Sequence, residues 1–148
     1  MSGPASPRVH TAALSELAPA TLYALLRLRL DIFVVEQASA YPELDGRDLE
    51  PGARHWWVED GTGPVSYLRV LGEPDGSRRI SRVVTRADRR GRGHAALLIR
   101  RALDSGGGTP VRVSAQAHLA DWYAGFGFRV VGPGYDEDGI PHVPMERL

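Results

Sequence analysis

A loop rich in glycine and arginine, placed between a strand pattern and a helical pattern, limits most strongly how this chain can fold. The loop reads Arg90-Gly91-Arg92-Gly93-His94-Ala95. It follows a β-branched stretch at residues 79–85 and leads into residues 95–103, where apolar side chains recur at helical spacing. Two glycines let the backbone curl with its N–H groups inward, and the helix N-terminus adds partial positive charge. The pattern therefore predicts a cradle for phosphate groups.

The segment around this loop carries a concentrated positive charge. Between residues 78 and 101, nine arginines accompany a single acid, Asp88, although the 18 basic and 18 acidic residues of the whole chain cancel. We therefore expect an isolated local field suited to phosphates. A nucleic-acid partner is not expected, because no aromatic residues lie among these arginines to stack on bases. The alternative interpretation is a glycine turn beside a solvated arginine face.

A second ligand class fits the same loop less well. Gly91-x-Gly93-x-x-Ala96 satisfies a dinucleotide-binding fingerprint. In that fingerprint the first glycine follows its strand almost directly, and an acid near the next strand binds a ribose. Here residues 86–90 intervene, and residues 111–114 contain no acid. The phosphate cradle is therefore the stronger hypothesis.

The remaining patterns predict a mixed α/β chain without internal repeats. An amphipathic helix is expected from Pro19 to about Phe33, followed by a long loop at residues 38–53 with room for a short helix. Three strands, at residues 55–59, 65–71 and 79–85, are expected to form an antiparallel meander. Beyond the central helix we expect a strand at 111–114, a short helix at 119–126, and strands at 128–131 and 142–145.

Composition excludes several kinds of chemistry. A chain of 148 residues, 43% of them hydrophobic, fits one domain spanning residues 1–148, with about the first eight residues flexible. The sequence has no cysteine and no lysine, which excludes thiolate nucleophiles, Schiff bases and a Walker-type phosphate loop. The five histidines lack ligand spacing, so we expect no metal. No apolar stretch is long enough for a bilayer and no secretory pattern is present, so a cytoplasmic location without membrane association is expected.

Arg90-x-x-Gly93-x-Ala95 resembles the phosphate-loop motif of the GNAT acetyltransferase superfamily. The resemblance extends from about Leu22 to Met145 and is nearest to the ElaA-type branch. Seven segments carry it in order and spacing, at residues 22–29, 33–37, 45–49, 82–84, 115–119, 122–128 and 137–142. Trp122 departs from the phenylalanine expected before Tyr123, which alters bulk rather than chemistry.

The resemblance implies a central twisted, mostly antiparallel sheet that is splayed between two parallel middle strands and flanked by helices. Acetyl-CoA would lie between the strands at residues 79–85 and 111–114, as a co-substrate that needs no metal. Backbone left exposed by the splaying would hold the pantetheine arm. The cofactor-binding residues expected on this basis are Val83, Thr85, Arg90, Gly91, Arg92, Gly93, His94 and Ala95.

The resemblance also implies candidates for catalysis. Tyr123 matches the tyrosine that protonates the departing thiolate in many such enzymes, and its alternative role is packing beside Trp122 and Phe126. An amine acceptor must lose a proton before it attacks, and His142 and Glu137 are the candidates for a base. Glu36 is expected to line the acceptor or to cap local backbone.

Two acidic groups bear on the acceptor. Residues 31–50 hold six acids against Arg47 alone, and Asp136, Glu137 and Asp138 form a second group. The resemblance places both around the acceptor end, which predicts a cationic amine, either a small molecule or a peptide; surface solvation is the alternative. The function predicted is direct acetyl transfer from acetyl-CoA to a primary amine in a ternary complex. The alternative is a non-catalytic module that senses CoA or another polyphosphate. A homodimer remains open.

Overall fold

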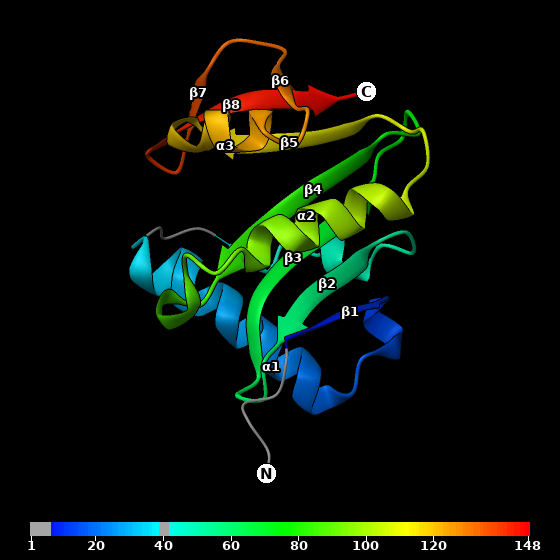
Figure 1. Cartoon of the computed structure of the whole chain (residues 1–148), viewed down its shortest axis with the longest axis vertical. Helices are drawn as coiled ribbons and strands as arrows, with labels where there is room; N and C mark the ends of the chain where they lie inside the picture. Colours follow the sequence, from blue (N-terminus) through cyan, green and yellow to red (C-terminus); the bar gives the residue numbers. More distant parts are fainter. Residues whose placement is uncertain (1–6, 39–41) are drawn as a thin grey trace.

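One mixed sheet runs through the molecule and divides its helices into two layers. The computed structural model describes residues 7–38 and 42–148. The sheet has eight strands in the order β1-β2-β3-β4-β5-β8-β6, with β7 pairing beside β8 (Figure 1). The strands are β1 (Arg8–Ala12), β2 (Arg54–Glu59), β3 (Pro64–Gly72), β4 (Arg78–Thr85), β5 (Val111–Gln116), β6 (Arg129–Val130), β7 (Tyr135–Glu137) and β8 (Ile140–Arg147).

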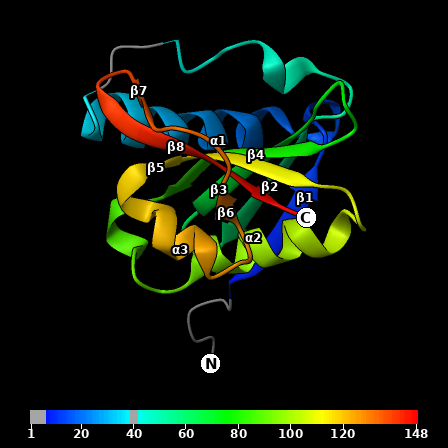
Figure 2. The ribbon, with the colours of Figure 1, turned by 90° about the horizontal axis from the view of Figure 1, so that it is seen from above.

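The two faces of the sheet are covered by different helices. Helix α1 (Pro19–Leu30) lies on one face, and α2 (His94–Ser105) and α3 (Ala120–Ala124) lie on the other (Figure 2). Leu98, Ile99 and Ala102 of α2 recur at helical spacing and are buried in the main core. Leu25 and Leu28 of α1 pack in a second, smaller core on the opposite face. The helical periodicities of the sequence therefore mark the faces that the sheet buries.

The expected meander and the expected splay are both confirmed. Strands β2, β3 and β4 pair antiparallel in sequence order. Strands β4 and β5 pair parallel, which requires the long crossover that α2 supplies. The parallel pairing covers only Arg78 to Ile80, after which β5 continues to pair with β8 alone. The mixed α/β fold predicted from the sequence is therefore present.

Several elements differ from the sequence-based expectations. Strand β1 pairs with β2, so Arg8, which was expected in a flexible N-terminus, lies in the sheet; residues 1–6 lie outside the described residues. Helix α1 continues into a π-helical segment, Asp31–Glu36. The long loop contains a 3₁₀ turn, Arg47–Leu49, and its residues 39–41 lie outside the described residues. The three-residue strand β7 was not predicted.

Candidate active site

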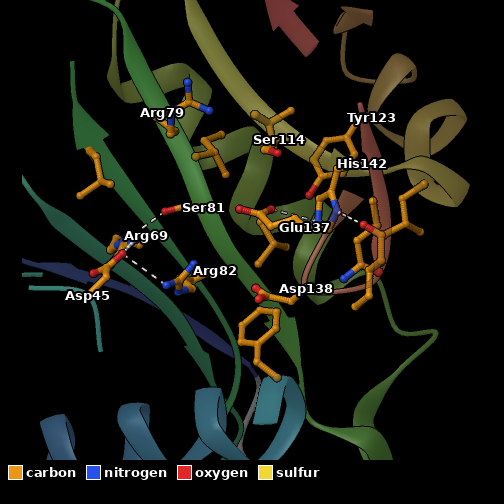
Figure 3. Close-up of a pocket in the computed structure, with 18 of the residues that line it drawn as sticks. Asp45, Arg69, Arg79, Ser81, Arg82, Ser114, Tyr123, Glu137, Asp138 and His142 are labelled. Carbon is orange, nitrogen blue, oxygen red and sulfur yellow. Dashed lines mark hydrogen bonds and ion pairs between the residues drawn. The ribbon is translucent and has the colours of Figure 1, made fainter. Parts of the chain in front are cut away.

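Divergence of β4 from β5 opens a pocket in the middle of the sheet. The pocket has a volume of about 460 Å³. Val83 of β4 and Val113 of β5 line it on its two sides, and Tyr123 of α3 lines it from the face that α2 and α3 cover (Figure 3). The β7–β8 hairpin contributes Glu137, Asp138 and His142. The pocket is therefore lined by residues from both faces of the sheet, with Phe33 on the side of α1 and Tyr123 on the side of α3.

A β-bulge in β4 lies at the point where the strands part. Arg69 of β3 is opposite Ser81 and Tyr67 is opposite Val84, so Leu68 alone faces both Arg82 and Val83. Arg82 has a φ of 56°, which is unusual for a residue with a side chain. Ile80 packs in the core beneath α2, whereas Val84, four residues later, packs in the core beneath α1. The bulge has thus reversed the alternation of the strand and changed which backbone groups face the pocket.

The glycine loop before α2 has the curled conformation that its glycines predicted. Gly91 and Gly93 both have a φ of 77°, and Gly93 is the N-cap of α2. The first intrahelical bond runs from the Leu97 N–H to the Gly93 carbonyl at 3.0 Å, which leaves the earlier N–H groups without intrahelical acceptors. A hollow of about 190 Å³ adjoins this end of the helix; Thr85, residues 89–96 and Trp122 line it. An anion placed there would meet backbone donors and the positive end of the helix dipole.

The predicted cofactor residues divide between these two hollows. Val83 lines the pocket and packs against the main core. Thr85 and all six residues from Arg90 to Ala95 line the hollow at the start of α2. Both hollows lie along β4 and its continuation. The structure therefore places the predicted residues along one strand and the loop that follows it, in two hollows that share no lining residue.

The isolated positive field expected from the sequence is wrong in three dimensions. Five of the nine arginines pair with carboxylates, in the pairs Arg79–Glu73, Arg82–Glu43, Arg86–Asp88, Arg89–Asp60 and Arg90–Glu36. Among the described residues, Arg92 makes no ion pair, and it lines the hollow. The error arises because four of those carboxylates lie outside the basic segment, where counting along the segment does not find them.

Glu36 has a different partner from those the sequence suggested. Its two carboxylate oxygens each accept a hydrogen bond of 2.6 Å from the Arg90 guanidinium. These bonds lower the pKa of Glu36 below its usual value. Glu36 therefore links the end of the π-helical segment to the loop before α2 instead of capping local backbone, and it does not line the pocket between β4 and β5.

The acids of the long loop are also engaged. Arg29 of α1 donates to Glu43 at 2.7 Å and to Asp48 at 2.7 Å, and all three side chains are buried or nearly so. Arg69 binds both oxygens of Asp45, at 2.9 Å and 3.0 Å. Although burial alone would raise it, the hydrogen bond from Arg69 lowers the pKa of Asp45 to about 2. These acids hold the loop on the sheet. Asp45 does line the pocket, but its charge is paired with Arg69 and Arg82.

Tyr123 combines burial with access to the pocket. Its side chain is only 4% exposed, and it meets Trp122 and Phe128 edge to face. Burial raises the pKa of its hydroxyl well above the usual value, so the phenol keeps its proton at neutral pH. The ring projects into the pocket beside His142 (Figure 3). Tyr123 can therefore act as a proton donor there, in addition to packing.

His142 and Glu137 face each other across the β7–β8 hairpin. The Nδ1 atom of His142 lies 2.7 Å from the Ile140 carbonyl oxygen, which can only accept, so Nδ1 carries a proton. In the neutral ring Nε2 is then unprotonated, and it lies 3.4 Å from the Glu137 carboxylate. The unprotonated Nε2 atom of His142 can therefore accept a proton from a cation, with the Glu137 carboxylate beside it to balance the charge.

Two further residues of the pocket were missed at the sequence level. The hydroxyl groups of Ser114 and Tyr135 are hydrogen-bonded to each other, and the Tyr135 ring stacks on His142 with centroids 6.0 Å apart. The pairing of β7 with β8 brings Tyr135 to this position. A strand of three polar residues has no periodic signal, so the sequence offered little to find it.

Neither a metal cluster nor a membrane-spanning helix is found in the described parts of the chain. Within residues 7–38 and 42–148, no three His, Asp or Glu side chains gather in a way that could hold a metal ion. Over the same ranges, no helix combines the length and the apolar character needed to cross a bilayer.

The comparisons with known proteins agree with this geometry. A family model described as an acetyltransferase (GNAT) domain matches residues 29–148, which is most of the chain. The chain belongs to the GNAT family. A GNAT relative in Escherichia coli, Protein ElaA, is 40% identical over 141 residues, which cover 90% of this chain and 91% of that protein. A UPF0039 protein of Mycobacterium tuberculosis is 49% identical over 130 residues, covering 85% and 83% of the two chains.

Solved structures show the same GNAT fold. The crystal structure of E. coli ElaA matches with a TM-score of 0.91 and 36% identity, over 97% of this chain and 100% of that one. A crystal structure described as an acyl-CoA N-acyltransferase from Pseudomonas aeruginosa matches with a TM-score of 0.91, 39% identity and the same coverage. The fold and the ElaA-type membership predicted from the sequence are thus confirmed.

Proposed function

We propose that this protein is an N-acetyltransferase that transfers the acetyl group of acetyl-CoA directly to a primary amine in a ternary complex. One observation carries the proposal: the hollow at the start of α2 and the pocket between β4 and β5 lie along the same strand. An extended molecule with a phosphate group at one end and an acyl group at the other fits such an arrangement. Family membership and the neighbouring acyl-CoA N-acyltransferase support the acyl-transfer class.

The phosphate end would bind at the start of α2. The backbone N–H groups there, together with Arg92 and the helix dipole, suit a pyrophosphate. The pantetheine arm, which contains amides, would run along β4 at Val83 and Thr85. Backbone N–H and C=O groups are available on this side because β4 and β5 no longer pair beyond Ile80.

The chemistry would take place near the bulge. A new C–N bond forms as the amine attacks the thioester carbonyl, and the C–S bond breaks. A backbone N–H at the bulge would stabilise the charge that develops on the carbonyl oxygen. His142 Nε2 takes one proton from the ammonium before the attack, directly or through water. Tyr123 donates its proton to the departing sulfur, and the second proton of the nitrogen that has attacked returns to the Tyr123 oxygen. Glu137 stabilises the resulting imidazolium. Because the chain has no cysteine, no acetyl-thiol intermediate on the enzyme can form.

Among the described acids that line the pocket, only those of the β7–β8 hairpin are not paired with arginine, and these could attract a cationic amine. Glu137 and Asp138 line the pocket, and among the described residues Asp138 makes no ion pair. The acids of the long loop, by contrast, pair with arginines. A cationic acceptor is therefore supported by two carboxylates rather than by the nine that the sequence suggested.

The deciding experiment measures free-thiol release from acetyl-CoA with a panel of amines, followed by mass spectrometry of the product. We expect thiol release that depends on an amine, and an acetylated amine as product. The non-catalytic alternative predicts CoA binding by calorimetry without thiol release for any amine. Absence of both binding and turnover would contradict the proposal and its alternative together.

A further inference from the structure

Three of the four arginines that line the pocket are hydrogen-bonded to carboxylates. Arg69 binds Asp45 and Asp48, at distances between 2.9 and 3.2 Å. Arg82 binds Glu43 and Asp45, at 3.0 and 3.2 Å. Arg47 binds both Glu50 and Glu73. These three guanidinium groups therefore use N–H donors in hydrogen bonds within the protein.

Arg79 is the exception among the four. Its only carboxylate neighbour in the described chain is Glu73, whose Oε1 lies 3.5 Å from the arginine Nε, and no hydrogen bond joins them. The same Oε1 atom already accepts a bond of 3.0 Å from Arg47. The Arg79 side chain is 31% exposed, so its donors are only partly open to water. A guanidinium has five N–H donors in a planar fork that matches a carboxylate or a phosphate.

Arg79 lies at the opposite end of the pocket from the acidic hairpin. It precedes Ile80, where β4 and β5 are still paired, whereas Asp138 lies toward the other end (Figure 3). At about 3.3 Å per residue, the four residue steps from Arg79 to Val83 span at most about 13 Å along β4. The phosphate hollow lies beyond Thr85, on the other side of the bulge. Arg79 is therefore placed to meet the acceptor rather than the cofactor.

We propose that the acceptor carries, besides its amine, an anionic oxygen group, a carboxylate or a phosphate, which binds Arg79. The amine would lie near His142 and Glu137, and the anionic group would lie some distance along the pocket. Amino acids and aminoalkyl phosphates are the matching chemical classes. This proposal rests on the proposed function, because it names the substrate class of the same site.

The test compares acceptors that differ only in the group far from the amine. One arm uses ω-amino acids of increasing chain length, a second uses aminoalkyl phosphonates, and a third uses the matching ω-amino amides. Charge-assisted hydrogen bonds contribute about 1.5–3 kcal/mol, so wild type should prefer the better anionic acceptor over its amide by roughly 10- to 100-fold in kcat/KM. In Arg79→Gln the preference should disappear through a higher KM for the anionic acceptor, with the amide unaffected.

Arg112→Gln provides a matched control. Arg112 is the register partner of Arg79 on β5, but it does not line the pocket, and it pairs with both Asp75 and Glu146. Its substitution should leave the preference intact. Equal use of anionic and amide acceptors by wild type, or a preference that survives in Arg79→Gln, would overturn the inference while leaving acetyl transfer intact.

A binding measurement separates this inference from the proposed function. In the presence of CoA, calorimetry should show tighter binding of an N-acetyl ω-amino acid than of its amide, and Arg79→Gln should abolish the difference. This measurement needs no turnover. If the two compounds bind with different affinity but no amine is acetylated, the result counts against catalysis and supports the Arg79 site. Equal binding of the two compounds would count against the site.

Discussion

Arg82 lines the pocket, and its side chain is hydrogen-bonded to the long loop of the protein. Its φ of 56° forms the bulge, and its guanidinium is tied to the Glu43 carboxylate at 3.0 Å and to the Glu43 carbonyl at 3.1 Å. A left-handed conformation costs a residue with a side chain about 1–2 kcal/mol. The ion pairs with the loop offset this cost and hold the backbone that faces the pocket.

The strain at Arg82 predicts an unusual order of stability. Arg82→Ala and Arg82→Gly lose the same ion pairs, but only alanine keeps the strain. After allowing for the greater freedom of glycine in the unfolded chain, Arg82→Gly should be the more stable by about 0.5–1 kcal/mol. Urea denaturation of both variants measures this difference. At Ser81, where the backbone is ordinary strand, Ser81→Ala should be more stable than Ser81→Gly. If alanine is the more stable substitution at both positions, the strained bulge at Arg82 is contradicted.

Tyr123→Phe tests the proton donor. The hydroxyl is proposed to act only as the thiolate departs, so its loss removes an interaction of the transition state. We expect kcat to fall about 10- to 100-fold, with the KM for acetyl-CoA within a few-fold. The assay is steady-state thiol release. Trp122→Phe is the control, because it changes the neighbouring aromatic and keeps the hydroxyl; full activity in Tyr123→Phe would reduce Tyr123 to packing.

The pH dependence of wild type follows from the same burial. Because burial raises the pKa of Tyr123 well above its usual value, the phenol remains protonated through pH 8 to 10. The general acid should therefore stay competent in that range, and kcat should not decline there through tyrosine ionisation. A kcat profile with a descending limb near pH 9 that is absent in Tyr123→Phe would contradict this expectation.

At the scale of elements, local sequence patterns predicted the loop before α2 better than the short strands β1 and β7. The loop before α2 was found from Gly91 and Gly93, because a glycine pair between a strand and a helix has few other uses. Tyr123 was predicted as the candidate acid only through the family resemblance, and its role stays a prediction. Strand β1 and the hairpin strand β7 were missed, because strands of five and three residues carry too little periodicity.

The ion pairs could not be predicted for a different reason. Arg29 and Asp48 are 19 residues apart in the sequence, and Arg90 and Glu36 are 54 residues apart. No local pattern specifies which carboxylate reaches which guanidinium, because the pairing is set by the packing of elements that are distant along the chain. Counting charges along a segment therefore described its composition correctly but did not predict the electrostatic field around it in the folded protein.

Gly93→Val tests the cradle as an element. A Cβ at Gly93 would meet nothing within 4 Å, so the substitution acts through the φ of 77° and by filling the hollow, rather than by a clash with the protein. CoA affinity should fall at least about tenfold, measured by calorimetry on a variant with normal circular dichroism. Gly76→Val is the control, because it shares the positive φ and the open space but lies in the β3–β4 turn. Unchanged CoA affinity in Gly93→Val would contradict the cradle.

At the scale of the whole molecule, the loop acids should control stability in acid. The pKa of Asp45, about 2, lies below its usual value of 3.8, so the native state binds protons less readily than the unfolded chain. The stability from this group is complete above about pH 4 and is lost as the pH falls through 2. Asp45→Asn should therefore be less stable than wild type at pH 6, and the gap should narrow at pH 3. Urea titrations at both pH values measure it; a constant gap would show that Asp45 is not engaged.

The short parallel pairing has a mechanical consequence. Beyond Ile80, the two halves of the sheet are held together by side chains of the main core, including Leu98 from one half and Tyr123 from the other, and not by backbone bonds. Hydrogen bonds are directional and fail when strands separate by an ångström, whereas apolar contacts tolerate small displacements. We therefore expect the two halves of the sheet to move relative to each other about these three residue pairs. The distance between β4 and β5 could then change without breaking a backbone hydrogen bond of the sheet.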